Sequence, residues 1–116
     1  MVDLAFPLGS GTYLVAGGGA SESVNGHFLT LNPKTDRQRA YRRQSYGADF
    51  IKIDKWGLGA SGSRPSGPAA YAIFGEPVLA TCDGQVLRAH DGLPDMQVPE
   101  TDTSLLEGNH VVLKCG

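Results

Sequence analysis

Three short runs of β-branched, aromatic and aliphatic residues mark the segments of this chain that are expected to form β-strands. They are Thr12 to Ala16, which ends at a run of three glycines, Ala48 to Ile53, and His110 to Cys115. Runs of about four to eight such residues, bounded by Gly, Asn and Asp, are typical of strands. The pattern therefore predicts at least three strands separated by long irregular segments.

The second of these runs also predicts which side chains are covered. Phe50, Ile51 and Ile53 are expected to cover a core face, while Lys52 and Asp54 face outward. An unpaired carboxylate is costly to bury, so a buried Asp49 beside these residues would need a cation or a full set of hydrogen bonds.

A fourth hydrophobic region, residues 71–89, contains two β-rich runs on either side of Asp83-Gly84. Asp-Gly between two such runs is a strong short-range signal for a β-hairpin. We therefore predict a tight hairpin with its turn at these two residues.

Long loops are expected near residues 32–45, 57–69 and 90–108. The first contains Arg37, Arg39, Arg42 and Arg43 among polar residues and is interpreted as an exposed loop with at most one helical turn, without a binding role. The second is rich in Gly, Ser and Pro, and the third in turn residues and carboxylates.

Composition agrees with a single, mostly β domain over residues 1–116. The sequence has 16 Gly and 7 Pro, which suits short strands joined by many turns better than long helices. A formal net charge of −2 provides no broad basic field, so nucleic acid is not expected as a partner. No membrane span is expected, and the first residues lack the basic and apolar regions of a signal peptide.

The 2 cysteines, Cys82 and Cys115, leave two interpretations open. They could form one disulfide if their strands are neighbours, which would favour an oxidising compartment, or they could be two small, partly buried thiols.

An ordered series of short motifs spans almost the whole chain and resembles the N-terminal portion of the lysostaphin-type zinc metallopeptidases. The motifs are Asn25-x-His27, Tyr46-x-Ala48-Asp49-Phe50, Phe74-Gly75-x-Pro77-Val78-x-Ala80, Asp83-Gly84-x-Val86, Asp91-Gly92-x-Pro94-Asp95 and Gly108-Asn109-His110-Val111. These enzymes are mostly peptidoglycan endopeptidases. The resemblance implies antiparallel sheets of the duplicated-hybrid-motif or barrel-sandwich type, here incomplete, and a location in the periplasm or outside the cell.

The resemblance also implies a zinc ion as cofactor, held by His27 and Asp49, with Asn25 as a residue behind His27 or a substrate contact. In this family the third ligand and a catalytic histidine come from a later His-x-His motif, which does not occur in this sequence. The commoner upstream motif is His-x-x-x-Asp, but Ser45 stands four residues before Asp49, so the upstream ligand is assigned to His27. The expected site has two of three ligands, and this chain alone is expected to be inactive.

Three functions follow as hypotheses. The first is a zinc-dependent peptidase domain acting on the peptide cross-links of peptidoglycan. The alternative is a non-catalytic cell-wall-binding or structural module with the same fold. A biotinyl- or lipoyl-type carrier, suggested by the region around Asp83-Gly84, is discounted because no Lys lies between Lys55 and Lys114. If the sheet is incomplete, its open edges are expected to cause self-association.

Overall fold

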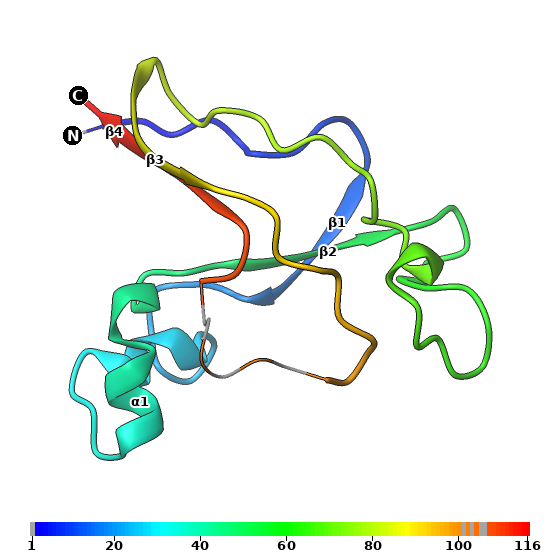
Figure 1. Ribbon diagram of the computed structural model, residues 1–116, viewed down its shortest axis with the longest axis horizontal. Helices are drawn as coiled ribbons and strands as arrows, with labels where there is room; N and C mark the ends of the chain where they lie inside the picture. The colour runs from blue at the N-terminus through cyan, green and yellow to red at the C-terminus, as the bar shows by residue number, and fades with distance from the viewer. Residues whose placement is uncertain (1, 101, 103, 105–106) are drawn as a thin grey trace.

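The computed structural model describes residues 2–100, 102, 104 and 107–116, and it confirms the expected mostly β architecture. Within these residues, four strands form two separate antiparallel sheets of two strands each: β1 (Thr12–Gly17) with β2 (Asp49–Ile53), and β3 (Gly84–His90) with β4 (His110–Cys115). Figure 1 shows the two pairs as distinct layers, and neither closes into a barrel. The strands predicted from the sequence at 12–16, 48–53 and 110–115 are therefore present.

The first sheet contains an irregularity that matters for the site. Thr12 pairs with Ile53 and Val15 with Phe50, but the register then shifts, so that Gly17 rather than Ala16 stands opposite Asp49. Such a bulge places two residues of one strand against one residue of the other and redirects the local side chains. The bulge in β1 lies opposite Asp49, the first residue of β2.

The second sheet corrects the predicted hairpin. β3 does not pair with the run before Asp83-Gly84; it pairs with β4, with Gly84 opposite Cys115 and His90 opposite His110. A Cβ atom at Gly84 would lie 2.4 Å from the carbonyl oxygen of Lys114. Glycine is therefore required here because two strands approach closely, and not because the chain makes a two-residue turn.

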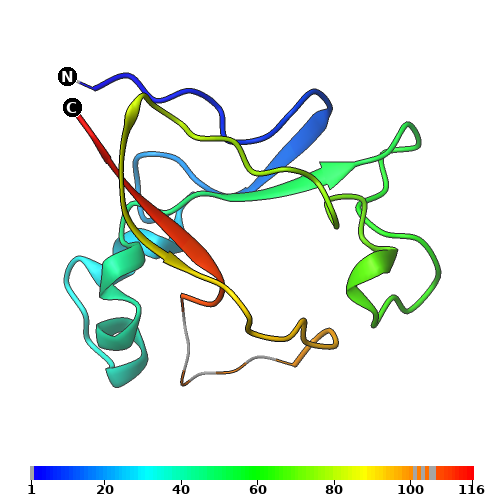
Figure 2. The same cartoon turned by 45° about the horizontal axis from the view of Figure 1, so that its top comes forward.

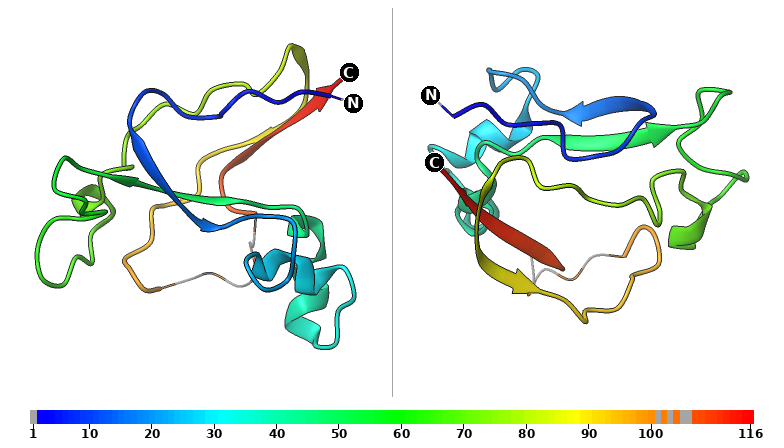
Figure 3. Two further views of the ribbon diagram at one scale, coloured as in Figure 1. Left: turned by 180° about the vertical axis from the view of Figure 1, so that it is seen from behind. Right: turned by 90° about the horizontal axis from the view of Figure 1, so that it is seen from above.

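A disulfide joins Cys82 to Cys115 at the start of this sheet, with the two Cα atoms 5.9 Å apart. The N-terminal segment runs along the chain that leads into β3: the Ala5 amide donates to Thr81, and Leu8 forms an isolated bridge with Val78. The segment that begins at Val2 consequently lies close to Gly116, beside this sheet (Figures 2 and 3).

Short helices occupy parts of two of the expected loops. The segment before β2 contains the 3-10 helix η1 (Gly26–Thr30), the helix α1 (Asp36–Ala40) and the 3-10 helix η2 (Arg42–Gln44), and η3 (Pro68–Ala70) lies in the second loop. Thr35 caps α1 through a capping box with Gln38, which explains how a five-residue segment with four polar residues holds a helical turn. No helix in the described part of the chain is long and apolar enough to cross a membrane.

The two faces of β2 carry different residues from those predicted, because successive side chains of a strand point to opposite faces of the sheet. Phe50 packs edge-on against Phe6, with ring centroids 5.1 Å apart, and Ile51 is exposed. Lys52 shares the face of Phe50, where it is partly covered and forms an ion pair with Glu76. The expectation that three hydrophobic residues share one face and that Lys52 points into solvent was wrong.

Hydrophobic burial is low throughout the described residues. None of their hydrophobic side chains is buried, and the buried residues are Asn25, Thr30 and Ser45. The accessible surface of 8874 Å² compares with about 6,100 Å² for a compact monomer of this mass. The radius of gyration is 15.5 Å, against about 13 Å for a compact domain of this length. The apolar faces of both sheets are therefore open to solvent.

Candidate metal centre

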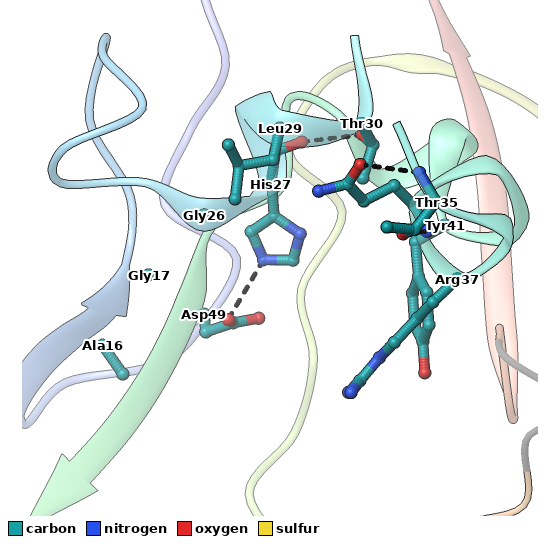
Figure 4. Close-up of a pocket in the computed structure, with 11 residues that line it drawn as sticks. Ala16, Gly17, Gly26, His27, Leu29, Thr30, Thr35, Arg37, Tyr41 and Asp49 are labelled. Carbon is teal, nitrogen blue, oxygen red and sulfur yellow. Dashed lines mark hydrogen bonds and ion pairs between the residues drawn. The ribbon is translucent and has the colours of Figure 1, made fainter. Parts of the chain in front are cut away.

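The two residues expected to bind zinc lie side by side although they are far apart in the sequence. His27 belongs to η1 and Asp49 is the first residue of β2, and the imidazole Nε2 lies 3.1 Å from the carboxylate Oδ2 (Figure 4). The 21 intervening residues comprise the rest of η1, then α1, η2 and the turns that connect them. The fold thus brings together a nitrogen and an oxygen ligand of the types that zinc prefers.

Asn25 places His27 through the main chain. It is 2% exposed, and its Oδ1 accepts a hydrogen bond from the His27 amide at 3.1 Å, which caps η1. Its Nδ2 donates to the carbonyls of Gly19 (3.2 Å) and Gly47 (3.1 Å). One buried amide therefore ties η1 to the loops on both sides, including the loop that leads into Asp49.

A second polar contact holds η1 against η2. Thr30 Oγ1 lies 2.7 Å from the His27 carbonyl and 2.6 Å from the hydroxyl of Ser45, and both hydroxyl-bearing residues are buried. The hydroxyl of Ser45, which occupies the position of histidine in the commoner family motif, is engaged in this contact. Its role here is to hold the segment that carries His27.

Two glycines leave room for the His27–Asp49 pair. A Cβ atom at Gly17 would lie 2.8 Å from Asp49 Oδ2, and one at Gly47 would lie 3.3 Å from both Cε1 and Nδ1 of His27. Gly17 is the residue that the bulge in β1 sets opposite Asp49. The space around the two candidate ligands therefore depends on the absence of side chains at these positions.

The two candidate ligands differ in exposure. The side chain of His27 is 21% exposed and that of Asp49 is 64% exposed. The reason first given for Asp49, that a buried carboxylate requires a cation, does not apply, because this carboxylate is solvated. Its position beside His27 is what makes it a candidate ligand.

The pair lies in an open pocket of about 550 Å³ whose opposite wall is formed by α1. Arg37 and Tyr41 extend side by side from this wall into the space beside Asp49 (Figure 4), with the guanidinium carbon 5.8 Å from the centre of the Tyr41 ring. Arg37 had been interpreted as part of a solvated charge run. Nothing in a run of four arginines shows which of them the fold turns toward a pocket.

The geometry of the pair fits two positions of a zinc site. Two ligand atoms bound at about 2.0–2.1 Å to a tetrahedral zinc are about 3.3 Å apart. The observed separation of 3.1 Å between Nε2 and Oδ2 is close to this value, so a small outward movement of either side chain would admit the ion. Both residues line the open pocket.

The other histidines lie elsewhere. His90 and His110 stand opposite each other on β3 and β4, with their rings stacked at 5.7 Å, and neither lines the pocket. In the part of the chain that the structure describes, no group of three or more His, Cys, Asp or Glu residues is arranged to hold a metal ion.

Comparison of the chain with protein-family models, with characterised proteins and with solved structures finds no match.

Proposed function

We propose that this chain supplies two ligands, His27 and Asp49, to the zinc centre of a peptidase that hydrolyses peptide cross-links in peptidoglycan. The observation that carries the proposal is the 3.1 Å contact between His27 Nε2 and Asp49 Oδ2 at the edge of an open pocket. The ordered sequence motifs that resemble the lysostaphin-type family support the same assignment independently, because they select these two residues without reference to the structure.

Each residue has a distinct part in this proposal. His27 would hold the zinc through its imidazole and Asp49 through its carboxylate, the two groups that lie in contact in the structure. Asn25 holds the His27 backbone in place through the cap of η1. Bound zinc would lower the pKa of a coordinated water toward neutrality and polarise a peptide carbonyl.

Catalytic zinc sites typically have three protein ligands and one open position. The proposed centre therefore requires a third ligand in addition to His27 and Asp49, and hydrolysis is expected only when that ligand is present. A periplasmic or extracellular location is part of the proposal. The Cys82–Cys115 disulfide supports it, because such bonds persist in oxidising compartments.

A second candidate function is a non-catalytic module that binds cell wall or serves a structural role. The observation in its favour is that His27 and Asp49 form a pair without a third candidate ligand grouped with them among the described residues. In that case the contact between them is an ordinary hydrogen bond between an imidazole and a carboxylate. The two candidates differ in whether the pair retains zinc.

The test is an equilibrium zinc titration of the purified chain, because a site with two protein ligands binds zinc weakly and would lose it on desalting. His27→Ala and Asp49→Ala remove the proposed ligands. His90→Ala and Asp83→Ala are matched controls, because these residues are exposed and belong to the β3–β4 side of the molecule. Circular dichroism on every variant checks that the fold is retained.

The proposal expects weak zinc binding by the parent chain and by both controls, because two of three ligands are present, and a large further loss of affinity in His27→Ala and Asp49→Ala. No zinc binding by any of the five proteins at equilibrium would contradict the metal centre and favour the non-catalytic module. Loss of zinc binding in a control variant would indicate that the zinc site lies on the β3–β4 sheet.

A further inference from the structure

Arg37 is a cation in the pocket that the proposed zinc centre does not use. It lies on α1 and lines the pocket together with His27 and Asp49. Its neighbour Arg39 is neutralised by Asp36, one turn away on the outer surface. Among the described residues, no carboxylate lies within ion-pair distance of the Arg37 guanidinium.

The orientation of Arg37 is supported by its neighbours. The guanidinium lies over the Tyr41 ring, and the two side chains extend together into the pocket (Figure 4). A cation–π contact at this distance favours the placement of the guanidinium while leaving its N–H donors available for a ligand. α1 itself is held by the capping box between Thr35 and Gln38.

The same wall offers a second donor. The side-chain oxygen of Gln38 accepts hydrogen bonds from the amides of Lys34 and Thr35, so its amide nitrogen is the part available to donate. Gln38 also lines the pocket. A planar guanidinium and a neutral amide donor match a single carboxylate, whereas phosphate sites commonly gather several cations or helix N-termini.

We propose that Arg37, beside Tyr41, binds a free carboxylate of the peptide substrate and so orients the substrate against the His27–Asp49 pair. The assignment of the ligand as substrate rests on the proposed function. Holding a substrate by a group remote from the reacting bond is a general means of lowering the entropic cost of the reaction. The expected substrate class is a peptide with a carboxylate close to the bond that is cut.

The test is an NMR titration of the chain with N-acetyl-Ala-Ala in two forms, one with a free C-terminal carboxylate and one with a carboxamide. Inorganic phosphate is titrated separately as a probe for anionic polymers. Each titration is made on the parent chain, on Arg37→Gln and on Arg39→Gln, with and without zinc. Arg39→Gln is the matched control, since it removes the same charge from the same helix outside the pocket.

The free acid is expected to shift the amide resonances of residues 37–41 and to bind at least about tenfold more weakly to Arg37→Gln, the range for losing a charge-assisted hydrogen bond. The carboxamide should bind weakly to every protein, and Arg39→Gln should behave like the parent. Equal binding of acid and carboxamide, or equal losses in the two arginine variants, would overturn the inference. A preference for phosphate over the acid would overturn it in favour of an anionic polymer.

The outcome separates this inference from the zinc proposal. Zinc retained by Arg37→Gln, combined with no difference between the two arginine variants in peptide binding, would refute the carboxylate site alone. A tenfold difference between the variants in a chain that retains no zinc would leave the carboxylate site standing and refute the metal centre.

Discussion

Replacing Asn25 with alanine should destabilise the fold more than the loss of a single hydrogen bond would. Asn25 makes three hydrogen bonds, one accepted from the His27 amide and two donated to the carbonyls of Gly19 and Gly47. Each net hydrogen bond contributes about 0.5–1.5 kcal/mol, so their loss gives about 1.5–4.5 kcal/mol. Because Asn25 is 2% exposed, water cannot readily replace these contacts, and we expect Asn25→Ala to lower the free energy of unfolding by about 3 kcal/mol.

The assay is urea unfolding followed by circular dichroism, with Asn109→Ala as the matched control. Asn109 also makes two side-chain hydrogen bonds, to the amide and the carbonyl of Leu93, but it is exposed. Water can take over these contacts, so Asn109→Ala should cost less than about 1 kcal/mol. A second variant, Asn25→Ser, keeps an acceptor for the cap and should fall between the parent and Asn25→Ala.

Equal unfolding free energies for Asn25→Ala and Asn109→Ala would refute the reasoning, because burial would then make no difference to the value of these hydrogen bonds. A large loss in Asn25→Ala that Asn25→Ser fully restores would show that the cap of η1 matters and the contacts to Gly19 and Gly47 do not. Zinc retention by Asn25→Ala should fall as well, since His27 loses its support.

Three further outcomes are expected. The hydrogen bond to Glu76 raises the pKa of Lys52 above 10.5, so this pair stabilises the fold fully below that pH and ceases to do so as the pH rises through the folded-state pKa. In unfolding experiments between about pH 9 and 12, Glu76→Gln should remove this alkaline loss of stability. An unchanged pH profile in this variant would count against the pair. Reducing the disulfide between Cys82 and Cys115, 33 residues apart, should cost about 3–4 kcal/mol in unfolding experiments; a change below about 1 kcal/mol would contradict the expected loop constraint. The exposed apolar faces of the two sheets should cause concentration-dependent association in sedimentation experiments, and a strictly monomeric chain with a cooperative thermal transition would argue against open sheets.

The strands could be predicted from the sequence because their signals are local. Runs such as Thr12 to Ala16 and His110 to Cys115 carry enough β-branched and aliphatic residues to identify them without knowledge of their partners. Pairing could not be predicted in the same way. Asp83-Gly84 has the local chemistry of a hairpin turn, yet β3 pairs with a strand that begins 20 residues after β3 ends, next to the Cys82–Cys115 disulfide.

The candidate site was predictable only where a motif pointed to it. His27 and Asp49 were selected through the family resemblance, and the fold places them together. The importance of Gly17 depends on a one-residue bulge, and that of Arg37 on the orientation of a five-residue helix. Both are three-dimensional relations that neither composition nor periodicity encodes.

The most direct test of the central claim is a long-range ¹H–¹⁵N NMR spectrum of the histidine side chains during titration with zinc. The sequence has 3 histidines, so each ring can be assigned with single His→Ala variants. The zinc centre predicts that Nε2 of His27 takes the shift of a metal-bound nitrogen while His90 and His110 do not change, and that Asp49→Ala abolishes the effect. Zinc-dependent shifts at His90 or His110, or none at His27, would contradict the assignment.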